Sequence, residues 1–340
     1  MRFSSSCSNF KQWNESATAL LIKTTWGRRL RLGLLAGTVV AYPICSLIMN
    51  GPLVKHSFSW RRKLDENGVP RHVKEITEAE YVNFLAKNNR SRKDAVVNHR
   101  MSTLPDATDT VSAGSLGVRT GLELALPFNT RFRSETEALE YMKQHHPTGI
   151  EYFGKFVSID WGSETGSELA SCFFLSPKAL RFLAIRDLYA HDGWQAIANR
   201  PLTWATFSSF TGVFTYWLHT SARIFGSTAL SFACIYVVFM SAAWYASNVW
   251  HDLYRYITDV FADSVASHIS FEHCDGGKEY YWKMLKRNRI LRDLEPGLSG
   301  VIKFTGDVAG ITTPLLVRFD HLKDVNAEDD EVKDALSGDD

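Results

Sequence analysis

Residues 201–250 form the stretch that most constrains how this chain can fold. These fifty consecutive residues contain one charged side chain, Arg223, when histidines are taken as neutral. The two parts, residues 201–222 and 224–250, are each long enough to cross a bilayer, which needs about 20 apolar residues per helix. A small soluble core cannot bury so much apolar sequence. Polar and amphipathic segments precede and follow it, so we predict a transmembrane helical hairpin inserted into a folded domain.

A third apolar stretch covers residues 32–49, which are uncharged and contain Pro43. Proline is tolerated in a membrane helix because neighbouring helices and polar side chains can satisfy the freed backbone group. The average composition hides these stretches, because 45% of the 340 residues are hydrophobic and the net charge is +1, as in many soluble proteins. We therefore predict a membrane-anchored chain with three transmembrane helices, at residues 32–49, 201–222 and 224–250.

Residues 1–31 are basic and rich in serine and threonine. Six of them are lysine or arginine, and Glu15 is the one acid. This composition is typical of a mitochondrial import segment, but a basic cytoplasmic tail in front of a signal anchor has the same composition. Positive residues also follow the first apolar stretch closely, so the charge pattern leaves the orientation open. We expect a matrix N-terminus, with the folded domain in the intermembrane space.

The polar parts of the chain predict an α+β fold with a small β-sheet, divided by the hairpin into residues 50–200 and 251–323. Ser176 is a good helix N-cap and Pro177 suits the first helical position. The predicted helices cover residues 76–87, 134–145, 178–190, 252–269 and 278–294. The predicted strands cover residues 121–127, 301–305 and 315–319, and a β-hairpin joins residues 156–160 to 169–175. We expect a loop at residues 92–109 and disorder in the acidic tail, residues 324–340.

Motifs for catalysis or cofactor binding are absent from the sequence, which has no P-loop, GxGxxG, GxSxG or HExxH pattern. We accordingly expect no cofactor, no metal and no nucleic-acid partner. Asp259 and Asp263 lie four residues apart on one helix face, where two carboxylates could bind a metal or act as acid and base. A solvated face or a contact with Arg255 is the alternative. His219 lies beside the predicted hairpin turn, where it either reaches lipid headgroups or serves a function inside the membrane.

Small residues are frequent in the two central apolar segments. Ser208 and Gly212 fall in the first segment, and Ser231 and Ala242 fall in the second. Small side chains let membrane helices approach one another closely. These four residues either pack the hairpin helices together or form a face for the helices of a partner protein.

Several short motifs follow one another in a set order outside the apolar segments, over roughly residues 28–323. They are Val111-Ser-Ala-Gly114, Ile159-Asp-Trp161, Leu175-Ser176, Arg181-Phe182, Arg186-Asp187, Glu279-Tyr-Tyr281 with Lys283 and Leu285, Arg318-Phe319 and His321-Leu322. This ordered set resembles the transmembrane protein 177 family of mitochondrial inner-membrane proteins. The chain departs from the family in its extended N-terminus, a longer region at residues 50–110 and its acidic tail. The resemblance implies a role in cytochrome c oxidase biogenesis, in which the family acts with the assembly chaperone of the copper-carrying subunit 2 and stabilises newly made subunit 2.

The order of elements also resembles the HtpX-like membrane zinc metallopeptidases. In those enzymes a capped helix carries His-Glu-x-x-His, and the helix after a membrane hairpin carries Glu-x-x-Ala-Asp. In register, Arg186 and Ala190 replace both histidine ligands, Asp187 stands for the general base, Asp259 for the third ligand and Asp263 for the final acid. A catalytic zinc needs three protein ligands and arginine stays protonated, so this resemblance implies a degenerate, zincin-like site. It predicts an ion pair between Arg186 and Asp259 in place of the metal.

The leading prediction is therefore a non-enzymatic factor of the mitochondrial inner membrane, in contact with the lipid bilayer, cytochrome c oxidase subunit 2 and its assembly chaperone. Client or chaperone helices would bind through the hairpin, with the folded domain as a docking surface. An active membrane metallopeptidase or other hydrolase is the first alternative. A purely structural membrane scaffold is the second.

Overall fold

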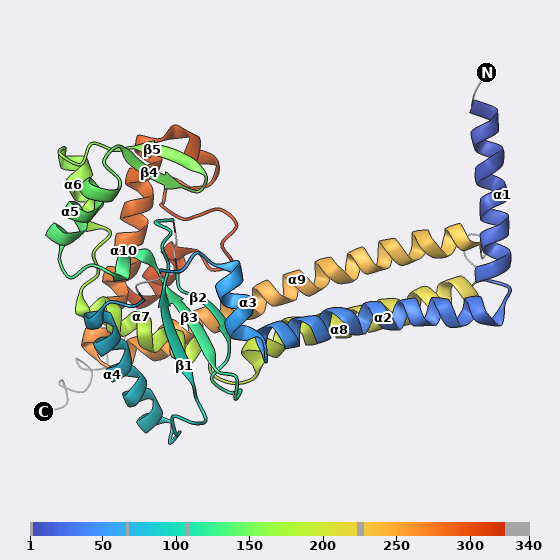
Figure 1. Ribbon diagram of the computed structural model, residues 1–340, viewed down its shortest axis with the longest axis horizontal. Coiled ribbons are helices and arrows are strands. Elements are labelled where there is room, and N and C mark those ends of the chain that lie inside the picture. The colour runs from blue at the N-terminus through green and yellow to red at the C-terminus, as the bar shows by residue number, and fades with distance from the viewer. Residues whose placement is uncertain (1–2, 66–67, 107–108, 223–227, 324–340) are drawn as a thin grey trace, which may run out of the picture. The chain divides into compact units, whose positions relative to one another are not determined.

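The computed structural model describes residues 3–65, 68–106, 109–222 and 228–323, and most of these residues are helical (Figure 1). The chain forms two compact units. We call residues 1–49 and 197–254 the helical unit, and residues 50–196 and 255–340 the mixed unit. The Arg223 of the sequence and the acidic tail lie outside the described residues.

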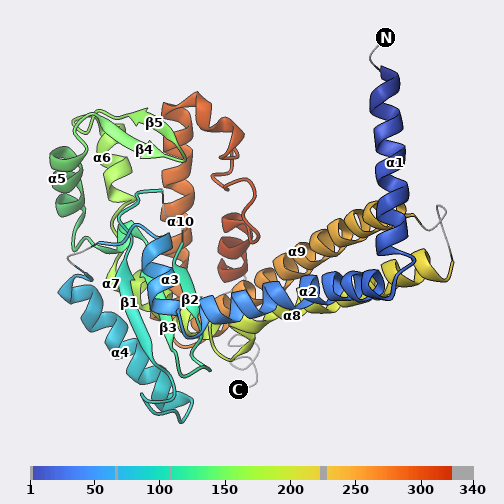
Figure 2. The same cartoon turned by 45° about the vertical axis from the view of Figure 1, so that its right-hand side comes forward.

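The helical unit is built from long helices, of which α2, α8 and α9 lie side by side (Figures 1 and 2). Its core includes Leu35, Phe232 and Met240. The indole N–H of Trp204 donates to the carbonyl oxygen of Thr38 at 3.1 Å, which ties α8 to α2. The helices are α1 (Phe3–Leu21), α2 (Thr25–Asn50), α8 (Gln195–Thr220) and α9 (Ala229–Ser267), and α9 continues into the mixed unit.

Two helices, α2 and α9, are long and apolar enough to cross a membrane. The prediction of three such helices is therefore wrong in number for the described residues. The difference concerns α8, which is 26 residues long but carries serine, threonine and histidine side chains that lower its mean hydropathy. Many of these polar side chains are buried, so they take part in the packing of α8 within the helical unit.

A three-stranded sheet lies in the mixed unit, in the order β1-β3-β2. Strand β1 (Val97–Met101) runs parallel to β3 (Leu122–Leu126), and β2 (Val111–Gly114) runs antiparallel to it. The predicted strand at residues 121–127 is confirmed as β3, but the loop predicted at residues 92–109 is wrong because it contains β1.

Strand β1 was not predicted, because its polar side chains have partners that only the fold supplies. Glu123 on β3 is buried, and it accepts hydrogen bonds from Asn98 at 2.7 Å and from Arg100 at 2.9 Å. Val97, His99 and Met101 therefore lie on one face of the strand, and the polar residues Asn98 and Arg100 lie on the other. Sequence alone offered no reason to expect a buried acid opposite it.

Helices cover the sheet, and α7 packs against both α4 and α10. Leu122 and Leu124 of β3 share one core with Phe84 of α4, Phe182 of α7 and Tyr281 of α10. These helices are α4 (Arg71–Lys87), α7 (Pro177–Ala190) and α10 (Phe271–Leu294), and α3 (Val54–Arg61) precedes them in the chain.

The N-cap predicted at Ser176 is confirmed. The Ser176 hydroxyl accepts a hydrogen bond from the amide of Ala179, with Pro177 in the first turn of α7. Ser134 caps α5 (Glu135–His145) in the same way, through the amide of Glu137. The predicted helices at residues 76–87, 134–145, 178–190, 252–269 and 278–294 are confirmed in type, although α4, α9 and α10 extend beyond these bounds.

A second core in the mixed unit includes Ile150, Tyr152 and Val157 of a two-stranded hairpin. Figure 2 shows the two strands of this hairpin. Strand β4 (Gly149–Tyr152) pairs with β5 (Lys155–Ser158) across a turn in which Phe153 and Gly154 both have positive φ. The predicted partner at residues 169–175 is wrong, because Ser163 caps a helix there, α6 (Glu164–Ser171). The short helices η1 (Phe128–Thr130) and η3 (Pro296–Gly300) also belong to the mixed unit.

The two strands predicted near the C-terminus are also wrong. Residues 301–305 contribute a single antiparallel bridge, between Ile302 and Val308. Residues 315–323 form a helix, on which Leu315 and Leu322 are buried. A short apolar run fits a strand and a buried helix equally well, and here burial on one helical face decided the outcome.

Candidate functional site

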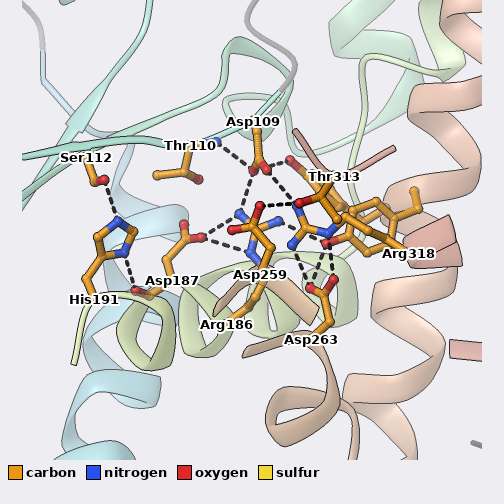
Figure 3. A network of polar contacts seen from close by, with 12 residues as sticks. Asp109, Thr110, Ser112, Arg186, Asp187, His191, Asp259, Asp263, Thr313 and Arg318 are labelled. Atoms are coloured by element: carbon orange, nitrogen blue, oxygen red, sulfur yellow. Dashed lines mark hydrogen bonds and ion pairs between the residues drawn. The ribbon is translucent and has the colours of Figure 1, made fainter. Parts of the chain in front are cut away.

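Four of the five residues predicted for a degenerate site lie in one neighbourhood of the mixed unit. Helix α7 supplies Arg186 and Asp187, and the last turns of α9 supply Asp259 and Asp263 (Figure 3). Ala190 ends α7 and has no polar side chain to contribute. The structure adds two residues that sequence analysis did not place here, Asp109 and Arg318. We call Asp109, Arg186, Asp187, Asp263 and Arg318 the arginine–aspartate network.

Every nitrogen of the Arg186 guanidinium has a partner. Nη2 lies 2.5 Å from Oδ1 of Asp109 and 2.5 Å from Oδ1 of Asp187, and Nε lies 2.9 Å from the same oxygen of Asp187. Nη1 donates to the hydroxyl of Tyr281 at 3.2 Å. The guanidinium also lies over the ring of Tyr280. A buried arginine in this setting is held in a fixed orientation by charge-assisted hydrogen bonds.

Arg318, from the helix at residues 315–323, forms a two-pronged pair with Asp263. Its Nε and Nη2 lie 2.6 Å and 2.8 Å from the two carboxylate oxygens. Both side chains are buried, and the Tyr281 hydroxyl donates to Asp263 at 2.7 Å. Because Tyr281 also accepts from Arg186, this one side chain links the two arginines.

Asp109 connects the two halves of the network. Its Oδ1 accepts from Arg186 and its Oδ2 accepts from Nη1 of Arg318 at 3.1 Å. Burial raises the pKa of Asp109, but the cations Arg186 and Arg318 outweigh it and hold that pKa at about 2. The carboxylate is therefore an ionised counter-charge rather than a proton donor at neutral pH.

Asp187 has the opposite electrostatic environment. Burial and the neighbouring charge of Asp109 raise the pKa of Asp187, although Arg186 acts against them. Its Oδ1 accepts from Arg186, while its Oδ2 is buried without a hydrogen-bond partner among the described residues. The structure thus places one strongly ionised and one less acidic carboxyl group on the same guanidinium.

The predicted ion pair between Arg186 and Asp259 is wrong. Arg186 is already saturated by Asp109 and Asp187, and Asp259 instead accepts a hydrogen bond from the hydroxyl of Thr313 at 2.8 Å. The alternative of a solvated acidic face fails for Asp263, which is fully buried. No ion pair joins Arg255 to either acid in the part of the chain that the structure describes.

A histidine–serine contact extends the network from the end of α7. His191 Nδ1 lies 2.8 Å from the carbonyl oxygen of Asp187, so this nitrogen carries the proton. The other ring nitrogen then accepts from the hydroxyl of Ser112 on β2 (Figure 3). This contact fixes the end of α7 to the edge of the sheet.

The side chains of the network are bonded to one another, so the network holds segments of the chain together. Among the described residues, no group of three or more histidine, cysteine or acidic side chains is placed to hold a metal ion. The network joins α7, α9, α10, the helix at residues 315–323 and the segment at Asp109. No sequence spacing pointed to Asp109 or Arg318, although Arg318 belongs to one of the short motifs.

Three of the four small residues predicted for a partner face are used inside the helical unit. The Ser208 hydroxyl donates to the carbonyl oxygen of Trp204 at 2.6 Å, and Ser208 and Ser231 are buried. A Cβ atom added to Gly212 would contact Leu35 and Met240, which lie across the helix packing. Ala242 alone is exposed. The small residues therefore serve internal packing, and the outer surface is left to larger side chains.

His219 is buried, which excludes the expected contact with lipid headgroups. Its Nδ1 lies 3.1 Å from Nη1 of Arg31, and its Nε2 lies 3.0 Å from the carbonyl oxygen of Thr228. Because arginine can only donate, Nδ1 is the acceptor and Nε2 carries the proton. The imidazole is thus a neutral bridge between α2 and the start of α9.

The comparison with known proteins agrees with the presence of helices that can cross a membrane. A family model described as Transmembrane protein 177 matches residues 22–340, which include the acidic tail. An uncharacterized protein of Caenorhabditis elegans is 49% identical over 334 residues, which cover 98% of this chain and 99% of that protein. No solved structure matches the chain, and neither match supports the resemblance to zinc peptidases. The protein is a membrane protein, and it belongs to the transmembrane protein 177 family.

Proposed function

We propose that this protein is a non-enzymatic factor of the mitochondrial inner membrane. In this role it assists the biogenesis and stability of cytochrome c oxidase subunit 2, together with the assembly chaperone of that subunit. The observation that carries the proposal is membership of the family across residues 22–340. The basic segment at residues 1–31, which resembles an import segment, supports the location.

The geometry of the mixed unit supports a binding role over catalysis. Asp109 and Asp263 are bound to arginines through both carboxylate oxygens, and the one oxygen of Asp187 without a partner among the described residues, Oδ2, is buried out of reach of a substrate. A general base or a metal ligand needs a lone pair free for the substrate or the ion. The network instead stiffens the unit, and a stiff surface loses little entropy on binding a client.

The helical unit offers its outer surface to a client. Phe210 and Val213 on α8 and Val237 and Val238 on α9 are each more than half exposed. In a bilayer such side chains face lipid or the helices of another membrane protein. A transmembrane helix of subunit 2 or of its chaperone would therefore pack on this outer face, at Ala242 and its larger neighbours, rather than against the buried small residues.

Pulse labelling in cells that lack the protein tests the role directly. Newly made subunit 2 is expected to decay faster than in normal cells, while the other newly made subunits keep their lifetimes. Re-expression of the full chain should restore the lifetime of subunit 2. An unchanged lifetime in the absence of the protein would contradict the proposal.

Two adjacent alanines provide a matched test of the binding face. Ala242 is exposed, whereas Ala243 is 1% exposed inside the helical unit. We expect Ala242→Leu to reduce co-purification of subunit 2 and its chaperone while leaving thermal stability unchanged. Ala243→Leu should instead lower stability by about 1–3 kcal/mol through overpacking. Full recovery of both partners with Ala242→Leu would remove this face from the mechanism.

The location and orientation can be tested with a C-terminal tag. The proposal expects the tag in the intermembrane space, where protease removes it once the outer membrane has been opened. A tag that stays protected until the inner membrane is dissolved would place the mixed unit in the matrix and reverse the orientation.

A further inference from the structure

A cavity of about 430 Å³ opens in the mixed unit beside the arginine–aspartate network. This volume lies in the range of small-molecule sites, which is roughly 300–1,000 Å³. Asp109, Thr313 and Arg318 form part of its wall, and their side chains are already engaged with one another or with neighbouring groups. The remaining wall residues decide what the cavity can bind.

Three cations line the cavity without an anionic partner among the described residues. Arg62 and Lys63 follow α3, and Arg255 lies on α9. The backbone next to Lys63 is fixed by the bridge between Leu64 and Ser102. Arginine and lysine side chains that form no ion pair favour an anionic ligand, and the guanidinium fork suits phosphate oxygens.

The loop at residues 310–313 adds neutral donors to the same wall. Gly310 has a φ of +82°, and its missing side chain leaves open space on that side. The four amide N–H groups of this loop make no hydrogen bond within the described residues. Consecutive free amides at a glycine turn are a common feature of anion-binding loops. They lie directly before the helix at residues 315–323, whose N-terminal end favours negative charge.

The cavity also exposes acceptors. Asp106 and Asp259 line it, and neither forms an ion pair with a described residue. A bare inorganic anion would meet these carboxylates unfavourably, whereas a ligand that also carries hydroxyl or amine donors would satisfy them. Cations and acceptors on one wall therefore select an anion attached to a donor-bearing group.

We infer that this cavity binds a phosphate ester whose alcohol part carries hydroxyl or amine groups. Arg62, Lys63 and Arg255 bind the phosphate, the loop at residues 310–313 supplies amide donors, and Asp259 accepts from the alcohol part. Two sources carry this chemistry: the headgroup of an anionic phospholipid and a free phosphate ester. The inference is independent of the proposed function, because it concerns a ligand and not a protein client.

The test uses the purified full chain and three probes. Glycerol 3-phosphate is titrated against protein in a non-ionic detergent, and inorganic phosphate is titrated in parallel. The third probe is a phosphatidylcholine nanodisc prepared with and without phosphatidylglycerol. Saturable binding, or a rise in melting temperature, with glycerol 3-phosphate identifies a free ester. An effect of phosphatidylglycerol alone identifies a lipid headgroup. No effect of any probe on the wild-type chain overturns the inference.

Variants locate the site. The double variant Arg62→Gln with Lys63→Gln, and the single variant Arg255→Gln, are each expected to weaken binding at least tenfold. The matched control is Arg119→Gln, which changes an exposed arginine of the same unit that does not line the cavity. The replaced side chains are exposed, so the variants should have the melting temperature of the wild type. If they do not, Arg255→Lys tests the same contact with charge kept and should retain most of the affinity. Wild-type affinity in both glutamine variants would refute the site.

Discussion

Both units of this protein bury arginine, but they do so with different partners. In the helical unit, Arg31 is 5% exposed and contacts the neutral imidazole of His219, with Tyr216 and Phe232 on its faces. In the mixed unit, Arg186 and Arg318 are bound by carboxylates on nearly every nitrogen.

The sequence explains part of the difference. Helices α2 and α8 and residues 229–250 of α9 contain no aspartate or glutamate. A carboxylate between membrane helices adds a second ion to an environment that solvates ions poorly. A neutral histidine and two rings partly satisfy Arg31 without that cost. The mixed unit can bury complete ion pairs, and it uses them to join distant segments.

The largest expected effect comes from breaking the best pair of the mixed unit. Arg318→Met leaves Asp263 buried with Tyr281 as its remaining partner and should lower the free energy of unfolding by about 3–5 kcal/mol. Urea unfolding of the full chain in detergent, followed by circular dichroism, measures this loss. The double variant Arg318→Met with Asp263→Leu should recover most of it.

A matched exposed pair calibrates that result. Arg71 and Glu75 form an ion pair at 2.7 Å on the surface of α4. Arg71→Met should change stability by less than about 0.5 kcal/mol, because solvent screens exposed pairs. Equal losses of stability for Arg318→Met and Arg71→Met would show that the buried network contributes no more to stability than an exposed ion pair.

The second prediction concerns the helical unit. Arg31→Met removes the hydrogen bond from Arg31 to Nδ1 of His219, so we expect a loss of about 1–3 kcal/mol, which is smaller than for Arg318→Met because no ion is stranded. Thermal unfolding in detergent measures it. A loss as large as that of Arg318→Met would erase the distinction drawn between the two units.

A third prediction uses pH. The pKa of Asp109 is about 2 in the folded protein, below the ordinary value of 3.8, so this group stabilises the fold above pH 3.8 and loses that contribution as the pH falls toward 2. Since about a third of the side chain is exposed, the effect is of the order of 1 kcal/mol. Asp109→Asn should lose stability at pH 7 and match the wild type near pH 2.

Asp187 provides the control of opposite sign. Its pKa is raised in the folded state, so its ionisation costs stability as the pH rises above the ordinary value. Asp187→Asn should therefore not destabilise the protein at pH 7. Parallel losses for both asparagine variants would show that hydrogen-bond geometry, and not charge, governs the network.

Among the buried arginines, the smallest effect is expected at Arg287. Arg287 in α10 lies between the rings of Tyr152 and Phe173, and its guanidinium nitrogens have no hydrogen-bond partner among the described residues. Arg287→Met loses the ring contacts but also removes a buried charge, and these effects offset each other to within about 1 kcal/mol. A loss near that of Arg318→Met in the same unfolding measurement would show that rings alone can hold a buried cation.

The sequence predicted features that depend on neighbouring residues. The N-cap Ser176 and strand β3 were recognised because a cap or a short apolar strand is encoded within a few residues. The hairpin of β4 and β5 was paired wrongly, since residues 169–175 suit a strand locally but pack as a helix and turn against the second core. The three predicted spans became two for a different reason, because the serine, threonine and histidine side chains of α8 lower its mean hydropathy.

By itself the sequence determined that this chain enters a membrane and that its polar parts form helices around a small sheet. Hydrophobicity and capping act over short distances, so they can be read directly. Only the tertiary structure decided which charges meet. Asp109 and Arg318 are 209 residues apart, and Arg31 and His219 are 188 apart. Such pairs form because distant segments pack together and because an unpaired buried charge is costly, and neither condition is visible in the residues taken one by one.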